Sequence, residues 1–256
     1  MTELIARRAF PAAYIGLDLL FLALFAGMLL WKRRYLTVLV GFLAGILYFL
    51  VDYGIFHLVC HARTITPGYS LFWVLAWMSM SYGFTNFAWI WLWVSKDQHL
   101  FEWSLLILLW WFVCPQLAGM FPGGEIVIQR TTGSYHGYMA LILLIGYLGL
   151  IFWNLREQEQ DCRMPIPWLL AIGILVQFGW EAGLLIGGIR SVGFTLEEKL
   201  RPLIINSLLE TNLGLPYLFA IYIAVTGRFT EQLRRLPDKL TFRDRLREYH
   251  HKEEAR

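Results

Sequence analysis

The sequence predicts an all-α, polytopic membrane protein with seven transmembrane helices, and two observations lead to that prediction. Of the 256 residues, 57% are hydrophobic and only 16% are charged, against roughly 25% charged residues in a soluble domain. The charged residues are absent from long stretches and concentrated between them. Because the apolar stretches are continuous rather than alternating, they favour helices over the strands of a membrane barrel.

A helix needs about 20 mostly apolar residues to cross the bilayer. Seven stretches meet this requirement, and we expect spans at residues 12–31, 35–60, 69–95, 102–121, 134–154, 165–188 and 203–226. The first run is too long for the core of a typical signal peptide and has no small-residue cleavage site, so we interpret it as a retained helix. The spans together predict a single transmembrane domain over residues 1–227.

Residues 228–256 form a tail in which basic and acidic residues alternate. Its segment LTFRDRLREYH fits a short amphipathic helix at the membrane surface. A solvated, frayed terminus fits the same composition. The sequence leaves both interpretations open.

Basic residues predict the orientation, since cytoplasmic loops are enriched in them. Fifteen of the 22 lysines and arginines fall on one predicted side, and nine of these lie in the tail. The other side would hold Arg7, Arg8, Arg63, Arg130, Arg190, Lys199 and Arg201. We therefore expect the N-terminus outside and the C-terminus in the cytoplasm.

Two parts of the chain resemble each other. Asp52 and Glu181 each begin an acid-x-Gly-apolar-apolar segment that an arginine follows, and Thr-Asn pairs come later in both parts, at residues 85–86 and 211–212. The offsets are 129 and 126 residues. Near-equal offsets suggest a 3+1+3 parallel pseudo-repeat, in which the fourth helix joins two copies. Chance matches in apolar sequence explain the same observation.

Three carboxyls within the predicted spans stand out: Asp52, Glu181 and Glu210. Ionisable groups within a membrane are costly and usually face the bundle interior. Each lies seven or eight residues from the predicted outer end of its helix, which is roughly 10–12 Å of depth at 1.5 Å per residue. Their common depth predicts a shared catalytic site, although each carboxyl also fits a structural role in hydrogen bonds between helices.

Other polar or aromatic residues fall in or near the same outer half of the bundle. We expect the following to contact a substrate: His57, Tyr82, Gln116, His136, Trp180 and Asn212. A neutral carboxyl in a low-dielectric pocket is a good general acid. Aromatic faces stabilise cations. The combination predicts acid–base chemistry on a lipid-like substrate, and it fits a proton or cation transport site equally well.

Several kinds of chemistry find no support in the sequence. His57, Cys60 and His61 have the spacing of metal ligands but no second ligand pair, so we predict no metal site and no cofactor. A net charge of +3 does not indicate nucleic-acid binding. The expected partners are membrane lipids and a lipid or isoprenoid small molecule.

The predicted helix count, the chain length and the positions of the acids resemble the integral membrane terpene cyclases of meroterpenoid biosynthesis. In that family a carboxyl on an early helix and another on the last helix act on an epoxide or alkene, which is protonated and then cyclises. The resemblance implies that Asp52 and Glu210 take these roles, with Trp180 and Glu181 as further candidates. The family has Glu at the early site and Asp at the late one, and the two types are exchanged here.

Three functional hypotheses follow. The first is a membrane-embedded acid–base enzyme for an isoprenoid or lipidic substrate, which would be a terpene cyclase if the resemblance holds. The second is a proton- or cation-coupled transporter or channel that uses the same acids. The third is a non-catalytic scaffold or receptor-like protein in which the acids are structural.

Overall fold

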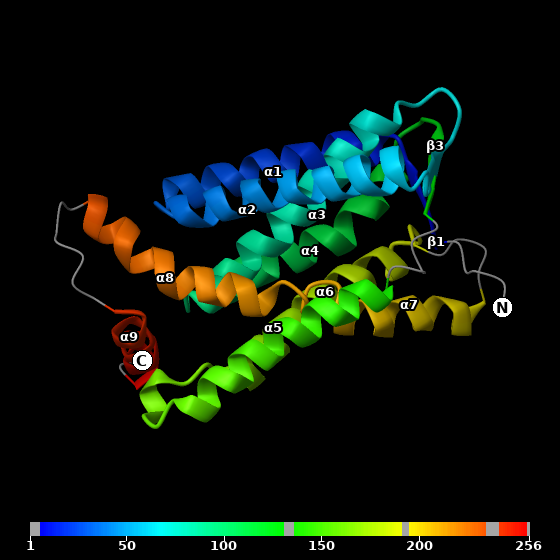
Figure 1. Cartoon of the computed structure of the whole chain (residues 1–256). Coiled ribbons are helices and arrows are strands. Elements are labelled where there is room, and N and C mark those ends of the chain that lie inside the picture. The colour runs from blue at the N-terminus through cyan, green and yellow to red at the C-terminus, as the bar shows by residue number, and fades with distance from the viewer. Residues whose placement is uncertain (1–5, 131–135, 191–194, 234–240, 255–256) are drawn as a thin grey trace. The chain divides into compact units, whose positions relative to one another are not determined.

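The computed structural model describes residues 6–130, 136–190, 195–233 and 241–254, which are almost entirely helical (Figure 1). The α-helices are α1 Ala13–Trp31, α2 Tyr35–Phe49, α3 Leu71–Val94, α4 Leu100–Ala118, α5 His136–Arg156, α6 Ile166–Ile186, α7 Leu196–Leu209, α8 Leu215–Leu233 and α9 Phe242–Glu254. A π-helix, η1 Leu50–Val59, continues α2, and a 3-10 turn, η3 Gln160–Cys162, precedes α6.

Within the part of the chain that the structure describes, five helical segments are long and apolar enough to cross a membrane: Ala13–Trp31, Tyr35–Val59, Leu100–Ala118, His136–Arg156 and Gln160–Ile186. They match the first, second, fourth, fifth and sixth expected spans. The prediction of a helical, multi-pass membrane protein is therefore confirmed in this coarse form, whereas seven spans and the 3+1+3 repeat are not confirmed.

The third expected span is a 24-residue helix, α3, but it is not among the five apolar segments. Its middle carries buried polar residues, including Ser79, Ser81, Thr85 and Asn86. These side chains lower its hydropathy. They are tolerated because neighbouring helices, rather than lipid, surround most of α3.

The prediction of one continuous helix over residues 203–226 is wrong. The chain leaves helical structure after Leu209 and resumes it at Leu215, so that α7 and α8 are separate helices. Pro216 lies in the first turn of α8, where its missing N–H has no helical partner to lose. In the interior of a single long helix, the same proline would remove a hydrogen bond and clash with the preceding turn.

The chain divides into two compact units, and the divisions fall within α6 and near the end of α7. Unit 1 comprises residues 1–136 and 175–207. Unit 2 comprises residues 137–174 and 208–256.

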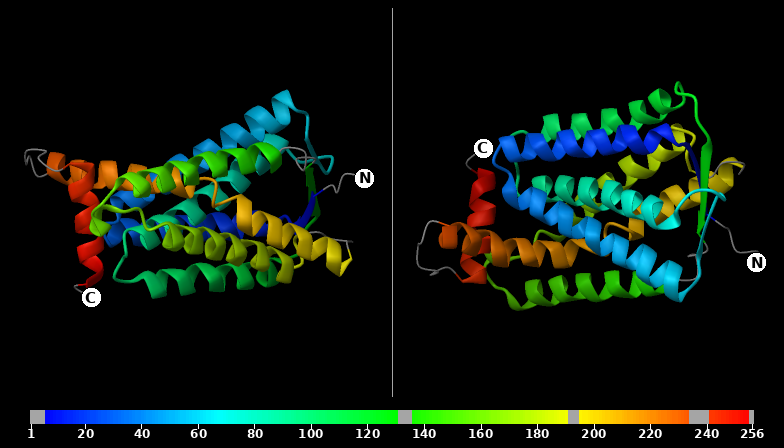
Figure 2. Two further views of the ribbon diagram at one scale, coloured as in Figure 1. Left: turned by 60° about the horizontal axis from the view of Figure 1, so that its bottom comes forward. Right: turned by 90° about the horizontal axis from the view of Figure 1, so that it is seen from above.

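In unit 1, α2 packs closely against α3, and α1 contacts both α3 and α4 (Figure 2). Gly45 and Gly83 face each other across this contact, where a Cβ added to Gly83 would lie 2.7 Å from the Cα atom of Gly45. Small residues allow such backbone contact between helices in membranes, where dispersion forces replace the hydrophobic effect.

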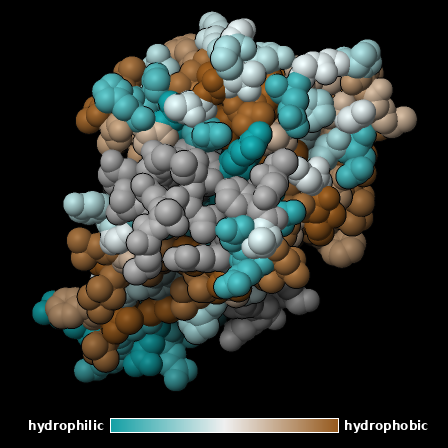
Figure 3. Space-filling view, turned by 90° about the vertical axis from the view of Figure 1, so that its right-hand side faces the viewer, coloured by the Kyte–Doolittle hydropathy of each residue, from teal (hydrophilic) through white to brown (hydrophobic). Residues whose placement is uncertain are grey.

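A three-stranded antiparallel sheet, which an all-α prediction did not foresee, lies at one end of unit 1. Its order is β1 Ala6–Pro11, β3 Glu125–Arg130, β2 Arg63–Ile65. Arg8 also forms a β-bridge with Arg190. This end of the molecule mixes hydrophilic and apolar side chains (Figure 3).

The sheet brings together arginines that the sequence placed on one side of the membrane. Arg7 and Arg8 are on β1, Arg63 is on β2 and Arg130 is on β3. Beyond the other end of α1, Arg34 pairs with Asp97 in the loop after α3. Within unit 1, the two expected groups of basic residues therefore lie at opposite ends of α1.

In unit 2, the tail forms the helix α9, which contacts η3 and α8. Phe242 packs against Trp153 with ring centroids 5.0 Å apart, and Tyr249 packs against Phe219 at 5.2 Å. The helical interpretation of the tail is thus confirmed for residues 242–254. Tyr249 is buried and Phe242 is half-buried against protein of the same unit.

Candidate functional site

Glu181 is the centre of a buried polar network in unit 1. Its side chain is 1% exposed, and its Oε2 atom lies 2.8 Å from Nε of Arg190. These two atoms lack the alignment of a hydrogen bond, so the contact is an ion pair. Asn206 donates to Oε1 at 3.1 Å, and Gln177 donates to the same oxygen at 3.4 Å. A guanidinium and two amides therefore compensate the buried carboxylate.

The network continues from Gln177 toward α2. The hydroxyl of Tyr82 donates to Oε1 of Gln177 at 2.7 Å, and the hydroxyl of Tyr48 lies 3.4 Å from that of Tyr82. The ring of Tyr82 also lies 5.5 Å from that of Trp180. Three residues that the sequence selected, Tyr82, Trp180 and Glu181, are thus brought together.

A second buried carboxyl, Asp18 on α1, was not selected from the sequence. It is 2% exposed and accepts a hydrogen bond from Nε1 of Trp77 at 2.9 Å. The side chains of Ser81 and Trp110 also lie beside this carboxyl. Among the described residues, no lysine or arginine forms an ion pair with Asp18. The signal that could have identified it was available, since Asp18 is a lone acid inside a predicted span.

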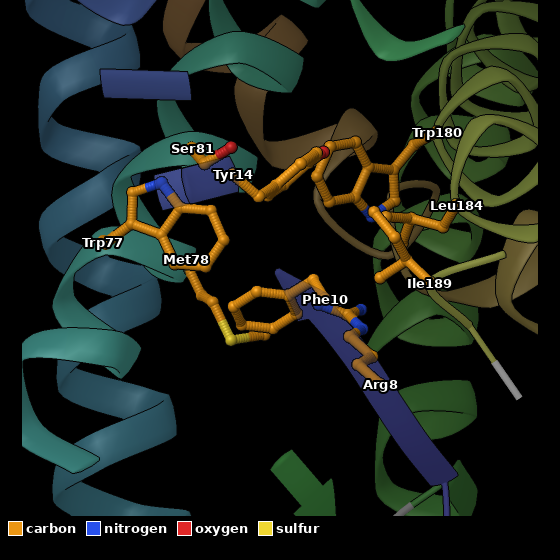
Figure 4. Close-up of a pocket in the computed structure, with 9 residues that line it drawn as sticks. All are labelled: Arg8, Phe10, Tyr14, Trp77, Met78, Ser81, Trp180, Leu184 and Ile189. Carbon is orange, nitrogen blue, oxygen red and sulfur yellow. The ribbon is translucent and has the colours of Figure 1, made fainter. Parts of the chain in front are cut away.

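A small cavity lies between these two regions of unit 1 (Figure 4). It is lined by Arg8, Phe10, Tyr14, Trp77, Met78, Ser81, Trp180, Leu184 and Ile189. Trp77 donates a hydrogen bond to Asp18, and Ser81 lies beside the same carboxyl. On the other side, Trp180 precedes Glu181 in the chain and Ile189 precedes Arg190. One wall thus includes residues beside Asp18, and the other includes the residues that directly precede Glu181 and Arg190 in the chain.

The walls of the cavity are mainly aromatic. Phe10 and Trp77 have ring centroids 5.2 Å apart, and Tyr14 meets Trp77 edge to face at 5.7 Å. The cavity volume is about 20 Å³. This is room for about one water molecule, so a larger ligand requires the side chains of the wall to move.

Asp52 has a different environment in the π-helix η1. Its carboxylate forms an ion pair with Arg63 of β2, whose guanidinium lies 5.7 Å from the centroid of the Phe56 ring. His57 lies one turn further along and contacts the ring of Tyr53 at 5.3 Å. Extended π-helical turns are rare and often occur at functional sites. Both sequence-selected acids of unit 1 are thus paired with the arginine that follows each in the chain.

The other selected residues do not line the cavity. Gln116 is exposed near the end of α4, and His136 is half-buried at the start of α5. Glu210 and Asn212 lie in unit 2, in the turns between α7 and α8. Asn212 is 1% exposed and accepts a hydrogen bond from Tyr147 at 3.4 Å. Of the expected substrate contacts, only Trp180 is in the cavity wall.

Two buried carboxyls of unit 1, Asp18 and Glu181, have different environments. Glu181 has a cationic partner, whereas the carboxyl of Asp18 has neutral donors around it. Burial without a cation favours a neutral acid, because an unpaired buried charge is costly. Among the described residues, no group of three or more histidines, cysteines or acids is placed to hold a metal ion.

Comparison with known proteins finds no matching family model, no similar curated protein and no similar solved structure. The function must therefore be inferred from the geometry of the site.

Proposed function

We propose that this protein is a membrane-embedded acid–base enzyme that acts on an isoprenoid or other lipidic substrate in the aromatic cavity of unit 1. One observation supports this most directly: the cavity lies between a carboxyl without a cation, Asp18, and an ion-paired carboxylate, Glu181. Pairs of acids in contrasting environments are typical of sites where one donates a proton while the other remains charged.

In this mechanism Asp18 supplies the proton and Ser81 carries it. Ser81 lies beside Asp18 and is also in the wall of the cavity. Its hydroxyl can accept a proton from the acid while it donates its own to an alkene or epoxide. Trp77 cannot perform this transfer, since an indole N–H only donates.

The remaining groups would stabilise the cation that protonation creates. The faces of Trp77, Trp180 and Tyr14 surround the cavity, and aromatic faces attract cations. Glu181 follows Trp180 in the chain and carries a negative charge, although Arg190 compensates much of it. These roles are those of a terpene cyclase, with the proton donor moved from Asp52, which is ion-paired with Arg63, to Asp18, which has no ion pair among the described residues.

Substrate binding requires the cavity to widen beyond the volume of a single water molecule. In the orientation that the basic residues predict, the sheet end of unit 1 faces outside and the C-terminus is cytoplasmic. Substrate would then enter from the outer leaflet.

The test uses two serines on the same helix. Ser79 and Ser81 are both buried on α3, but only Ser81 lines the cavity, and the hydroxyl of Ser79 has no hydrogen-bond partner among the described residues. Asp18→Asn and Ser81→Ala should lower conversion of prenylated substrates by about 10²–10⁴-fold, the typical contribution of general acid catalysis. Ser79→Ala should retain activity. Full activity in Asp18→Asn would refute the mechanism.

A proton- or cation-coupled transporter is the second candidate, and the two ion pairs Asp52–Arg63 and Glu181–Arg190 favour it. Protonation of either acid would release a buried arginine, and intramembrane acids are common in proton relays. A pH-dependent flux into liposomes that Asp52→Asn abolishes, without any turnover of prenylated substrates, would support transport over catalysis.

A further inference from the structure

Trp180 on α6 has a buried indole N–H that forms no hydrogen bond. The side chain is 5% exposed, and its Nε1 atom has no hydrogen-bond partner within the described parts of the chain. Buried polar groups in native proteins are almost always paired with protein or with ordered water, because an unpaired donor is costly. We therefore expect an acceptor from outside the chain at this nitrogen.

The ring of Trp180 is held in place by its aromatic neighbours. Its centroid lies 5.5 Å from that of Tyr82 and 5.1 Å from that of Trp111, which meets it edge to face. Figure 4 shows the indole nitrogen on the same side of the ring as Leu184 and Ile189, and both of these residues line the cavity of unit 1 together with Trp180. Because the packed ring cannot turn freely, the acceptor for its N–H is expected in this cavity.

The cavity has the size and the polar groups that one water molecule needs. Its volume is about 20 Å³, whereas a water requires roughly 10–15 Å³ and two to four polar partners. Besides Trp180, the hydroxyls of Tyr14 and Ser81 are in the wall. The indole N–H can donate to the water oxygen, and the water can donate to a hydroxyl oxygen. Because the cavity is so small, a single water reaches groups on both of its walls.

A ligand that enters the cavity has to replace this water. An apolar group would leave the N–H of Trp180 buried and unpaired, and displacing an ordered water by a group that cannot reproduce its hydrogen bonds lowers the affinity. An indole N–H only donates, so the ligand must supply an acceptor. On an uncharged lipid this acceptor is the oxygen of a hydroxyl or carbonyl group.

We propose that the cavity binds one water molecule at Nε1 of Trp180. The substrate is a lipid whose reactive end bears a hydroxyl or carbonyl oxygen, and this oxygen takes the place of the water. The inference rests on the proposed function of the cavity and specifies its substrate class. Trp180 then determines specificity, since its N–H positions the oxygen. Ser81, which lies beside Asp18, lines the same cavity and is placed to pass a proton to that oxygen.

Two isoprenoid probes test the substrate class. Farnesol and farnesene have chains of the same length and differ in the oxygen at one end. The full-length protein in nanodiscs should bind farnesol about 5- to 100-fold more tightly, with both affinities expressed per lipid, because farnesene leaves a buried donor unpaired. Trp180→Phe removes the donor but keeps an aromatic ring, so it should bring the ratio of the two affinities close to one.

Trp103→Phe is the matched control. Trp103 on α4 is 6% exposed, and its Nε1 atom also lacks a hydrogen-bond partner among the residues described, but it does not line the cavity. This variant should keep the preference for farnesol in full. Equal affinity of the unmodified protein for the two probes, or a preference that Trp180→Phe retains, would overturn the inference. Tighter binding of farnesoic acid than of farnesol would indicate an anion site and would also overturn it.

The water is tested on the unmodified protein, so this result does not depend on whether Trp180→Phe folds. A high-resolution density map of the ligand-free protein should show one ordered water within hydrogen-bond distance of Nε1 of Trp180. A second map with farnesol bound should show the oxygen of farnesol in its place. A cavity without this water, or a water that stays when farnesol binds, is incompatible with the inference.

Failure of this inference differs from failure of the proposed enzyme. Asp18→Asn should lower turnover but keep the preference for farnesol, because Trp180 is unchanged. A protein that prefers farnesol but converts no prenylated substrate would support the oxygen-bearing ligand and refute the catalytic role. A protein that converts farnesene and binds both probes equally would have the opposite outcome.

Discussion

Ion pairs occur in both units, but their surroundings differ. In unit 1, the side chains of Glu181 and Arg190 are 1% and 5% exposed. In unit 2, Arg247 of α9 pairs with Glu159, and these side chains are 39% and 48% exposed. The chemical groups are the same. The buried pair has no water to replace a lost partner, whereas either member of the exposed pair can be hydrated instead.

The pairs around α9 form a surface network. Arg243 donates to Glu157 at 2.8 Å and lies 3.7 Å from Glu159, which Arg247 also contacts. Hydrogen bonds from Arg243 lower the pKa of Glu157, and those from Arg247 lower the pKa of Glu159. The comparison teaches that the buried Glu181–Arg190 pair affects the stability of the fold of unit 1. The exposed pairs of unit 2 affect only how tightly α9 is held.

The largest expected effect comes from breaking the buried pair. Arg190→Gln leaves the carboxylate of Glu181 buried without its cation and should lower the free energy of unfolding by about 3–5 kcal/mol. Unfolding of the purified protein in mixed micelles measures this. The double variant Glu181→Gln, Arg190→Gln should recover much of the loss, because it removes the uncompensated charge. A single variant as stable as the unmodified protein would show that water or lipid reaches Glu181.

A smaller loss of stability should come from overpacking the contact between α2 and α3. It tests whether the interior of unit 1 is packed more tightly than the surface network around α9. Gly83→Ala places a Cβ 2.7 Å from the Cα and 2.8 Å from the N of Gly45, and backbone cannot move aside cheaply. Overpacking of this kind costs about 1–3 kcal/mol. The matched control is Gly16→Ala on α1, where nothing lies within 4 Å of an added Cβ. Equal stability of the two variants would contradict a close α2–α3 contact.

The smallest effect concerns pH and α9. The ordinary pKa of Glu157 and Glu159 is 4.5, and it is lowered in the folded state. Their stabilisation of the docked helix is therefore complete above about pH 4.5 and is lost as the pH falls below it, through the lowered folded pKa. Hydrogen exchange of residues 242–254, corrected for the intrinsic rate at each pH, should accelerate over that range.

A double variant provides the control for this experiment. Glu157→Gln with Glu159→Gln removes both titrating groups, so α9 should exchange faster at neutral pH and show little further change in acid. Equal protection of α9 in both proteins at both pH values would mean that the rings of Phe242 and Tyr249, rather than the ion pairs, hold the helix.

The sequence anticipated part of the candidate site. It selected Asp52 and Glu181 and noted the arginine that follows each, and the structure pairs each acid with that arginine. The sequence did not select Asp18, although its hydrogen bond to Trp77 joins residues 59 positions apart. Such partners depend on how α1 and α3 pack, and a helix that is apolar around its whole circumference gives no periodic signal of which face meets its neighbour.

What the sequence determined by itself is the need for helices in a membrane, because long apolar stretches must satisfy their backbone hydrogen bonds internally. It also determined the separation of basic residues into groups at opposite ends of the first span. Only the tertiary structure decided that residues 203–226 contain two helices, that β1 joins a sheet, and that Arg8 lines an aromatic cavity between Asp18 and Glu181. These features depend on contacts between distant segments, which local composition does not encode.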